Sequence, residues 1–109
     1  MIEVHISVAH DFTETPGGRY AQDGKWSGEE FRKRIIEPKL VEIIQSGGKL
    51  RISLDGVAGY ATSFLEETFG GLVRDLKRQV SPFLEIETAN SVRLREVTKY
   101  IREEESRLP

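Results

Sequence analysis

The chain has 109 residues, a formal net charge of -2 and no cysteine. This length supports one hydrophobic core, so we expect a single domain over residues 1–109. Acidic and basic residues are interspersed, which leaves no field to attract nucleic acid or an anionic membrane. The lack of cysteine excludes disulfides, thiolate nucleophiles and zinc–thiolate sites. No leader or bilayer-length apolar run is seen, so we expect a cytoplasmic protein.

The first predicted element is a strand, because Ile2 to Val8 alternates apolar and polar residues. Residues 9–25, "AHDFTETPGGRYAQDGK", then show neither helical nor strand periodicity. A loop this long in a small domain is either mobile or functional.

A helix is predicted after this loop. Ser27 and Glu30 form a capping box at its start, and Gly47 ends it. Pro38 lacks a backbone donor and should bend or interrupt it. A second strand follows at Leu50–Leu54.

Two more helices and one more strand are predicted in the second half. Thr62 or Ser63 should cap a helix that buries one apolar stripe, and "FLEIET" is typical of a strand. Asn90 or Ser91 should cap the last helix, with Leu94, Val97 and Ile101 facing inward. Strands separated by helices need crossover connections. We therefore expect an α/β fold: a mainly parallel or mixed sheet of three to four strands, with three helices packed on it.

The turn after the second strand, "LDGVAGYATSFLEE", is the main candidate site. Ligands of open α/β sheets gather at the carboxyl ends of strands, and free N–H groups at a helix start favour negative charge. Thr62 or Ser63 is thus either a cap, or a residue that accepts a phosphoryl group or contacts a phosphate. The turn lacks the Gly-x-Ser-x-Gly elbow of hydrolases, and we expect no enzymatic activity.

This strand, turn and helix resemble the centre of STAS domains, the fold of bacterial anti-sigma-factor antagonists. Their Asp-Ser-Ser-Gly-Leu motif aligns with Ala61 to Leu65, with Thr62 and Ser63 at the hydroxyl positions. The resemblance implies that a partner kinase phosphorylates Thr62. The chain looks still closer to bacterial STAS-like domains of unknown function, through "DFTETPGGRYAQDGKWSGEEFRKRIIEPKL" and "DGVAGYATSFLEETFGGLVR". That family implies a fold and no established activity.

Two adjacent glycines in "FGGLVRDL" weaken the helix that follows the turn. They indicate either close contact with a neighbouring helix of the same domain or a shallow partner surface. The partner surface would comprise residues at helical spacing: Phe64, Glu67, Gly71 and Asp75. STAS-type regulators dock to kinases around this helix. A homodimer through Gly71 is a further possibility.

The long loop contains Gly-Gly-Arg-Tyr, which is either a plain turn or a recognition element using Arg19, Tyr20 and Trp26. No Gly-Lys-Ser/Thr follows, so it is not a P-loop. We do not expect the side chains of His5 and His10 to lie close enough to bind one metal ion. We therefore expect no metal and no cofactor.

The sequence therefore predicts a non-enzymatic regulatory module. Its partner would be a kinase-like ATPase or a serine/threonine kinase, with a switch at Thr62 or Ser63. The alternative is a small-ligand or nucleotide phosphate-binding protein in which Arg19 folds over Thr62.

Overall fold

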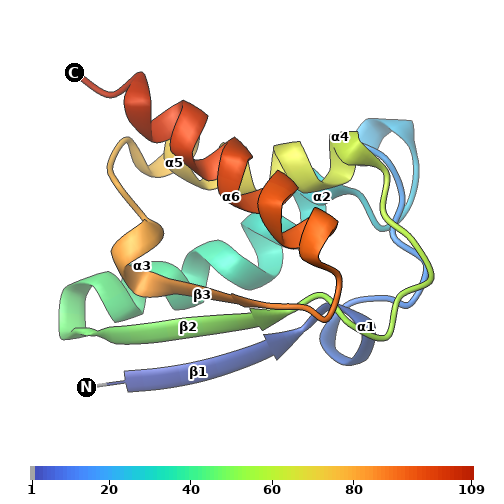
Figure 1. Cartoon of the computed structure of the whole chain (residues 1–109), viewed down its shortest axis with the longest axis horizontal. Helices are drawn as coiled ribbons and strands as arrows, with labels where there is room; N and C mark the ends of the chain where they lie inside the picture. The colour runs from blue at the N-terminus through green and yellow to red at the C-terminus, as the bar shows by residue number, and fades with distance from the viewer. Residues whose placement is uncertain (1) are drawn as a thin grey trace.

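The computed structural model describes residues 2–109 and contains a three-stranded parallel sheet in the order β1-β2-β3. The strands are β1 (Ile2–Ser7), β2 (Gly48–Ser53) and β3 (Leu84–Glu87). Ile2 lies opposite Gly48 in the first pair, and Leu50 lies opposite Leu84 in the second. The predicted α/β class is confirmed, with a sheet that is wholly parallel (Figure 1).

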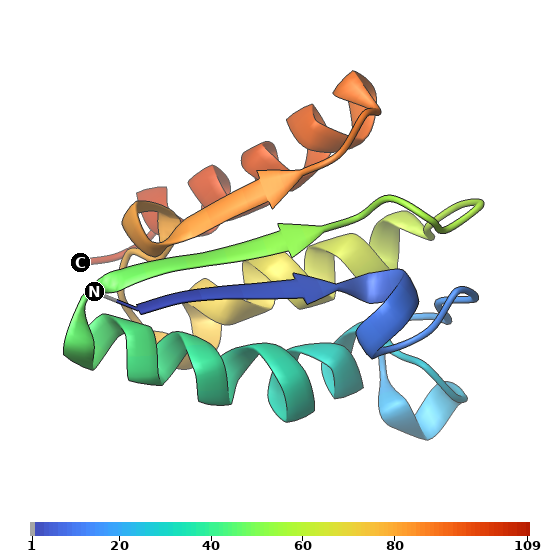
Figure 2. The same ribbon diagram turned by 90° about the horizontal axis from the view of Figure 1, so that it is seen from below.

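Three long helical segments connect or follow the strands. The first comprises α2 (Gly28–Glu30), η2 (Phe31–Ile36) and α3 (Glu37–Ser46); the second comprises α4 (Thr62–Leu65), η3 (Glu66–Gly70) and α5 (Gly71–Leu76); the third is α6 (Ser91–Ser106). Viewed from below, all three lie behind the sheet, so the domain has two layers (Figure 2). The connections also contain three short helical turns, α1 (Val8–Asp11), η1 (Ala21–Asp23) and η4 (Ser81–Phe83).

The first helix begins and ends where the sequence predicts. The Ser27 hydroxyl accepts a hydrogen bond from the Glu30 N–H at 3.0 Å, and the Gly47 N–H closes the last turn on Ile43. Pro38 does not interrupt the helix. The π-helical turn η2 lies just before Pro38. In a regular α-helix the proline ring would crowd the carbonyl of residue 34, and proline has no N–H to donate to that carbonyl.

Several boundaries differ from the prediction. The strand predicted at Leu50–Leu54 is β2 and covers Gly48–Ser53. Val8 belongs to the short helix α1 rather than to β1, because the Ser7 hydroxyl caps a turn there. The second helix ends at Leu76, since Lys77 adopts a left-handed conformation with φ of 57°. The predicted cap of the last helix is confirmed for Asn90, whose side chain accepts from the Arg93 N–H at 2.9 Å.

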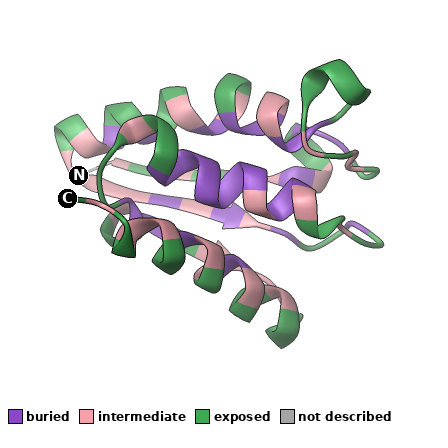
Figure 3. Ribbon diagram, turned by 90° about the horizontal axis from the view of Figure 1, so that it is seen from above, coloured by how far each residue is buried: buried purple, intermediate pink, exposed green. Residues whose placement is uncertain are grey.

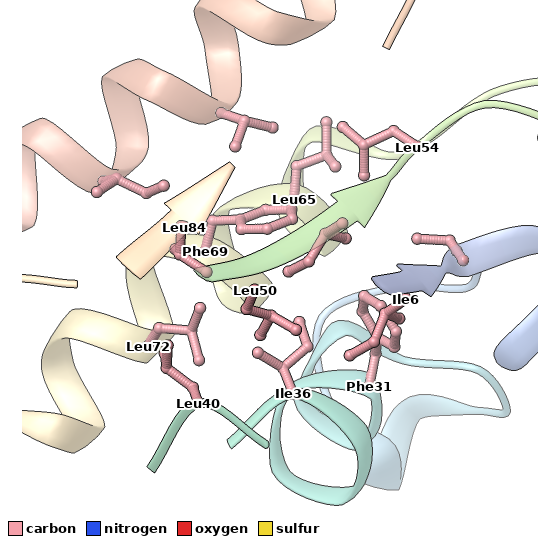
Figure 4. Packing of buried hydrophobic residues seen from close by; sticks show 14 of the residues in the cluster. Ile6, Phe31, Ile36, Leu40, Leu50, Leu54, Leu65, Phe69, Leu72 and Leu84 are labelled. Carbon is pink, nitrogen blue, oxygen red and sulfur yellow. The ribbon is translucent and has the colours of Figure 1, made fainter. Parts of the chain in front are cut away.

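The core lies between the sheet and the helices. It includes Ile6 and Leu50 from the strands, and Phe31, Phe69 and Leu72 from the helices (Figure 4). The segment α4 to α5 runs between the other two helices and is the most deeply buried of the three (Figure 3). Its position places the start of α4 beside the start of α6.

The opposite face of the sheet carries polar side chains. Arg51 on β2 pairs with Glu3 on β1 and with Glu85 on β3, both at 3.3 Å. His5 bonds to Glu87 at 2.7 Å across the same face. His5 is thus held by a carboxylate, and residues 2–109 contain no cluster of three or more His, Asp or Glu side chains that could hold a metal ion.

Candidate functional site

Thr62 lies exposed at the first residue of α4. The predicted capping role is wrong, because Ala61 occupies the N-cap position and no side chain caps this helix. Ala61 has extended φ and ψ, so the chain enters the helix one residue before the first hydroxyl. Within residues 2–109, no hydrogen bond engages the hydroxyl of Thr62 or Ser63. Thr62 is exposed and Ser63 is half-buried, so Thr62 is the more accessible of the two.

A shallow groove of about 230 Å³ runs beside Thr62. One wall comes from the turn and α4, and the other comes from the start of α6; the lining residues are Tyr60, Thr62, Leu65, Asn90, Val92, Arg93 and Glu96. The groove therefore lies between two helix N-termini, whose partial positive charges favour an anion. Arg93 adds a full positive charge to the same place.

Tyr60 comes from the turn and lines the groove beside Thr62. Its hydroxyl donates to the carbonyl of Leu54 at 2.8 Å, and the Arg93 guanidinium lies 4.7 Å from the centre of its ring. Burial raises the pKa of the Tyr60 phenol well above its ordinary value. The phenol therefore stays protonated at neutral pH. Its uncharged ring is the aromatic surface on which the Arg93 guanidinium rests.

Sequence reasoning missed Arg93. It is the third residue of α6, in a helix whose alternating charges are typical of a solvated face. Only the parallel order β2-β3 brings the starts of α4 and α6 together, and no local pattern encodes that proximity. The predictable clue was topological: both helices follow the carboxyl ends of neighbouring strands.

The prediction of an exposed partner surface on the second helix is wrong. Phe64 is fully buried and lies 6.1 Å from the Phe31 ring, and Glu67 and Gly71 are buried as well. Asp75 is exposed and bonds to Arg32 at 2.9 Å. These four residues face the helix of residues 28–46, so the glycine pair serves contact within the domain.

Gly71 is required by the close approach of Arg32. A Cβ at position 71 would lie 2.9 Å from Arg32 Cδ and still nearer to its guanidinium. Because Gly71 is buried against Arg32, the surface expected for a homodimer through Gly71 is not exposed.

Arg32 is the centre of a buried cluster that the sequence did not reveal. Its guanidinium donates to the carboxylate and to the backbone carbonyl of Glu67, both at 2.6 Å, and to Asp75. Glu37 Oε2 lies 3.2 Å from the same guanidinium. Arg32 and Glu67 sit on the two π-helical turns, η2 and η3, which pack against each other.

The Glu37 and Asp75 carboxyl groups beside Arg32 have opposite pKa shifts. Burial, with the neighbouring Asp75 carboxylate, raises the pKa of Glu37 to about 7. Burial also opposes ionisation of Asp75, but hydrogen bonds from Glu37 and Arg32 outweigh it and hold the Asp75 pKa below its ordinary value. Of the two carboxyl groups, Glu37 is therefore the one that holds its proton up to about pH 7.

Arg19 does not fold over Thr62. Its guanidinium donates to Glu66 at 2.5 Å and to Glu67 at 3.2 Å, about one helical turn further along. It does not line the groove beside Thr62. The phosphate pocket expected from Gly-Gly-Arg-Tyr is therefore not assembled, because the Arg19 guanidinium is paired with the Glu66 and Glu67 carboxylates.

The rest of the long loop is tethered to the start of the first helix. The Gly28 N–H donates to the Gly18 carbonyl at 2.9 Å, and the Glu29 N–H donates to the Arg19 carbonyl at 3.0 Å. Tyr20 is 42% exposed and Trp26 is 36% exposed, so both aromatic side chains reach solvent as a recognition element requires.

Two parallel β–α–β connections, helices on a single sheet face and a polar groove at the strand ends define a small α/β binding domain. The family model for the STAS-like domain of unknown function (DUF4325) matches residues 27–91, and the chain belongs to this family. No curated protein and no solved structure matches the chain. None of the helices within residues 2–109 has the length and apolar character needed to cross a membrane.

Proposed function

We propose that this STAS-like domain is a non-enzymatic regulatory module whose switch is Thr62. The observation that carries the proposal is the position of Thr62: exposed, unbonded, and in a groove between two helix starts beside Arg93. A kinase must reach its acceptor hydroxyl, and this side chain is reachable. Phosphorylation adds nearly two negative charges and three acceptor oxygens at a place where helix N-termini and a guanidinium favour them.

The partner in this proposal is a kinase-like ATPase or a serine/threonine kinase, and it docks over the groove rather than along the second helix. Val92 on the rim is 53% exposed and supplies an apolar contact next to Thr62. Glu96 lies on the same rim and places an acidic group there. A phosphoryl group on Thr62 changes both the charge and the shape of this surface, so partner binding changes while the core keeps its packing.

The test is incubation with ATP and with kinase-like ATPases and serine/threonine kinases from the same genome, followed by mass spectrometry. The parent chain should gain one phosphoryl group, Thr62→Ala should gain none, and Ser63→Ala should behave as the parent. Binding to the same kinase, measured by calorimetry, should be weakened by Val92→Lys and unchanged by Val41→Lys, since Val41 is an exposed residue of α3. A parent chain that is neither modified nor bound would refute the proposal.

The rival function is binding of a nucleotide or another phosphate compound. Two helix N-termini and Arg93 also suit a free phosphate, whereas the loop cation Arg19 is engaged with Glu66 and Glu67. A rise in melting temperature with nucleotide that is abolished by Arg93→Ala would favour the rival, because ligand binding stabilises the folded state. A chain that nucleotide does not stabilise would count against it.

A further inference from the structure

β3 is the last strand of the sheet, and its outer edge has no neighbouring strand within residues 2–109. The Glu87 carbonyl accepts from the Leu54 N–H at 2.9 Å, so Glu87 directs its backbone groups toward β2. Alternate residues of a strand point the same way, so Leu84 and Ile86 direct theirs outward. The Leu84 N–H donates to Ser81 in η4. The Leu84 carbonyl and both polar groups of Ile86 therefore face the open edge.

The helix α6 extends over this open edge. A groove of about 280 Å³ separates it from β3, lined by Ser81, Leu84, Ile86, Leu94, Thr98, Ile101, Arg102 and Glu105. Viewed from below, β3 is the outer strand on the side of α6, and no strand lies beyond it (Figure 2). Leu94 was expected to face the core but is 37% exposed, because nothing beneath it in the sheet covers its side chain.

The free backbone groups and the groove together fit an extended chain. Such a chain pairs its own N–H and C=O groups with those of Ile86, and its alternate side chains lie on opposite faces. One row of side chains enters the groove beside Leu94 and Ile101, where the lining has four apolar residues and four polar ones. The other row lies on the polar face, next to the exposed carboxylates of Glu85 and Glu87.

Charge decides what that second row contains. Glu85 and Glu87 are the side chains of β3 on the polar face of the sheet. Arg51 pairs with Glu85 and His5 pairs with Glu87, yet the two carboxylate side chains stay 49% and 38% exposed, so a fourth strand would meet acidic groups on this face. A strand with lysine or arginine at alternate positions places opposite charges across the pair, which stabilises cross-strand contacts.

Two copies of β3 do not pair well along this edge. Antiparallel pairing of two β3 strands with Ile86 opposite Ile86 places Glu85 opposite Glu87. Pairing with Glu85 opposite Glu85 also places like charges opposite each other. Pairing of odd-numbered with even-numbered residues would direct the glutamates of the second strand into the groove. Like charges directly opposite each other destabilise a strand pair.

We propose that the outer edge of β3, with the groove under α6, binds an extended segment of a partner protein in which apolar residues alternate with basic ones. This segment becomes the fourth strand of the sheet. The inference does not depend on the Thr62 switch, since the groove shares no lining residue with the one beside Thr62.

The experiment titrates the full chain, labelled with ¹⁵N, with the capped peptide Lys-Val-Lys-Val-Lys-Val-Lys. Two control peptides carry Glu in place of every Lys, or N-methyl groups on the three valines. The lysine peptide should bind with a dissociation constant of about 1 mM or tighter, shift the amide resonances of β3, and slow hydrogen exchange of the Ile86 amide. Both control peptides should bind at least about tenfold more weakly.

Two variants place the site. Leu94→Lys puts a charge in the groove at an exposed position, and it should weaken binding at least about tenfold, whereas Val41→Lys on α3 is the matched control with 39% exposure. Ile86→Pro removes the outward N–H without removing a bond to β2, so it should fold and lose binding. Equal binding of the glutamate or N-methyl peptide, or of Leu94→Lys, would overturn the proposal. So would the absence of binding, or a dimer in sedimentation that Leu94→Lys dissociates.

Discussion

Replacement of Glu37 by Gln tests the buried cluster around Arg32. The Glu37 pKa is raised from 4.5 to about 7, and its side chain is only 20% exposed. Between these pH values the folded protein retains a proton that the unfolded chain has released, so stability falls as the pH rises through this window. The loss amounts to about 3 kcal/mol at most, with a slope of no more than about 1.4 kcal/mol per pH unit. The lowered pKa of Asp75 acts below its ordinary value of 3.8, outside the window.

Glutamine keeps the shape of the protonated Glu37 and cannot ionise. Glu37→Gln should therefore match the parent near pH 4.5, lose the slope, and exceed the parent's free energy of unfolding above pH 7. Urea denaturation followed by circular dichroism at several pH values measures this difference. Glu42→Gln is the control, because Glu42 is an exposed residue of the same helix. A parent whose stability is flat between pH 4.5 and 7, or a variant that keeps the slope, would refute the raised pKa of Glu37.

Three further predictions concern the same helices. Arg32→Met should lower the free energy of unfolding by about 3–5 kcal/mol, because it leaves Glu67 buried and unpaired; Arg34→Met, at an exposed position, should cost about 1 kcal/mol or less. Gly71→Ala should cost about 1–3 kcal/mol in thermal unfolding, since its Cβ would meet Arg32, and Gly18→Ala should be nearly neutral because nothing lies near it. Thr62→Glu should fold and gain up to about 1 kcal/mol at low salt, through the helix N-terminus. A loss above about 1 kcal/mol in Thr62→Glu would mean that the groove does not accept negative charge.

Hydrophobic periodicity predicted the elements and the layer order well. Ile2 to Ser7 and Leu50 to Ser53 alternate as half-buried strands, and each is followed by a helix, so a parallel sheet follows from chain order alone. Capping residues predicted the helix starts at Ser27 and Asn90 because their side chains accept hydrogen bonds from backbone N–H groups three residues further along. These interactions are local, and the sequence displays them directly.

The candidate site was less predictable because its contacts are between elements. Phe64 and Glu67 lie at helical spacing with Gly71, but only the packing of two helices decides that this side is covered. Arg32 shows the same limit. An arginine in a charged helix is usually exposed, and its burial depends on Glu67 and Asp75, two carboxylates that are distant in the sequence. Leu94 fits an inward stripe, yet the sheet ends before reaching it.

The aromatic side chains form a continuous row through the domain. Trp26 packs edge-on against Phe12 at 5.2 Å, Phe12 lies against Phe31, and the row continues through Phe64 to Tyr60, whose ring carries Arg93. The chain contains one tryptophan. The row of rings begins at the Thr62 groove and ends at this tryptophan. Its native fluorescence therefore reports on the other end of the row without a label.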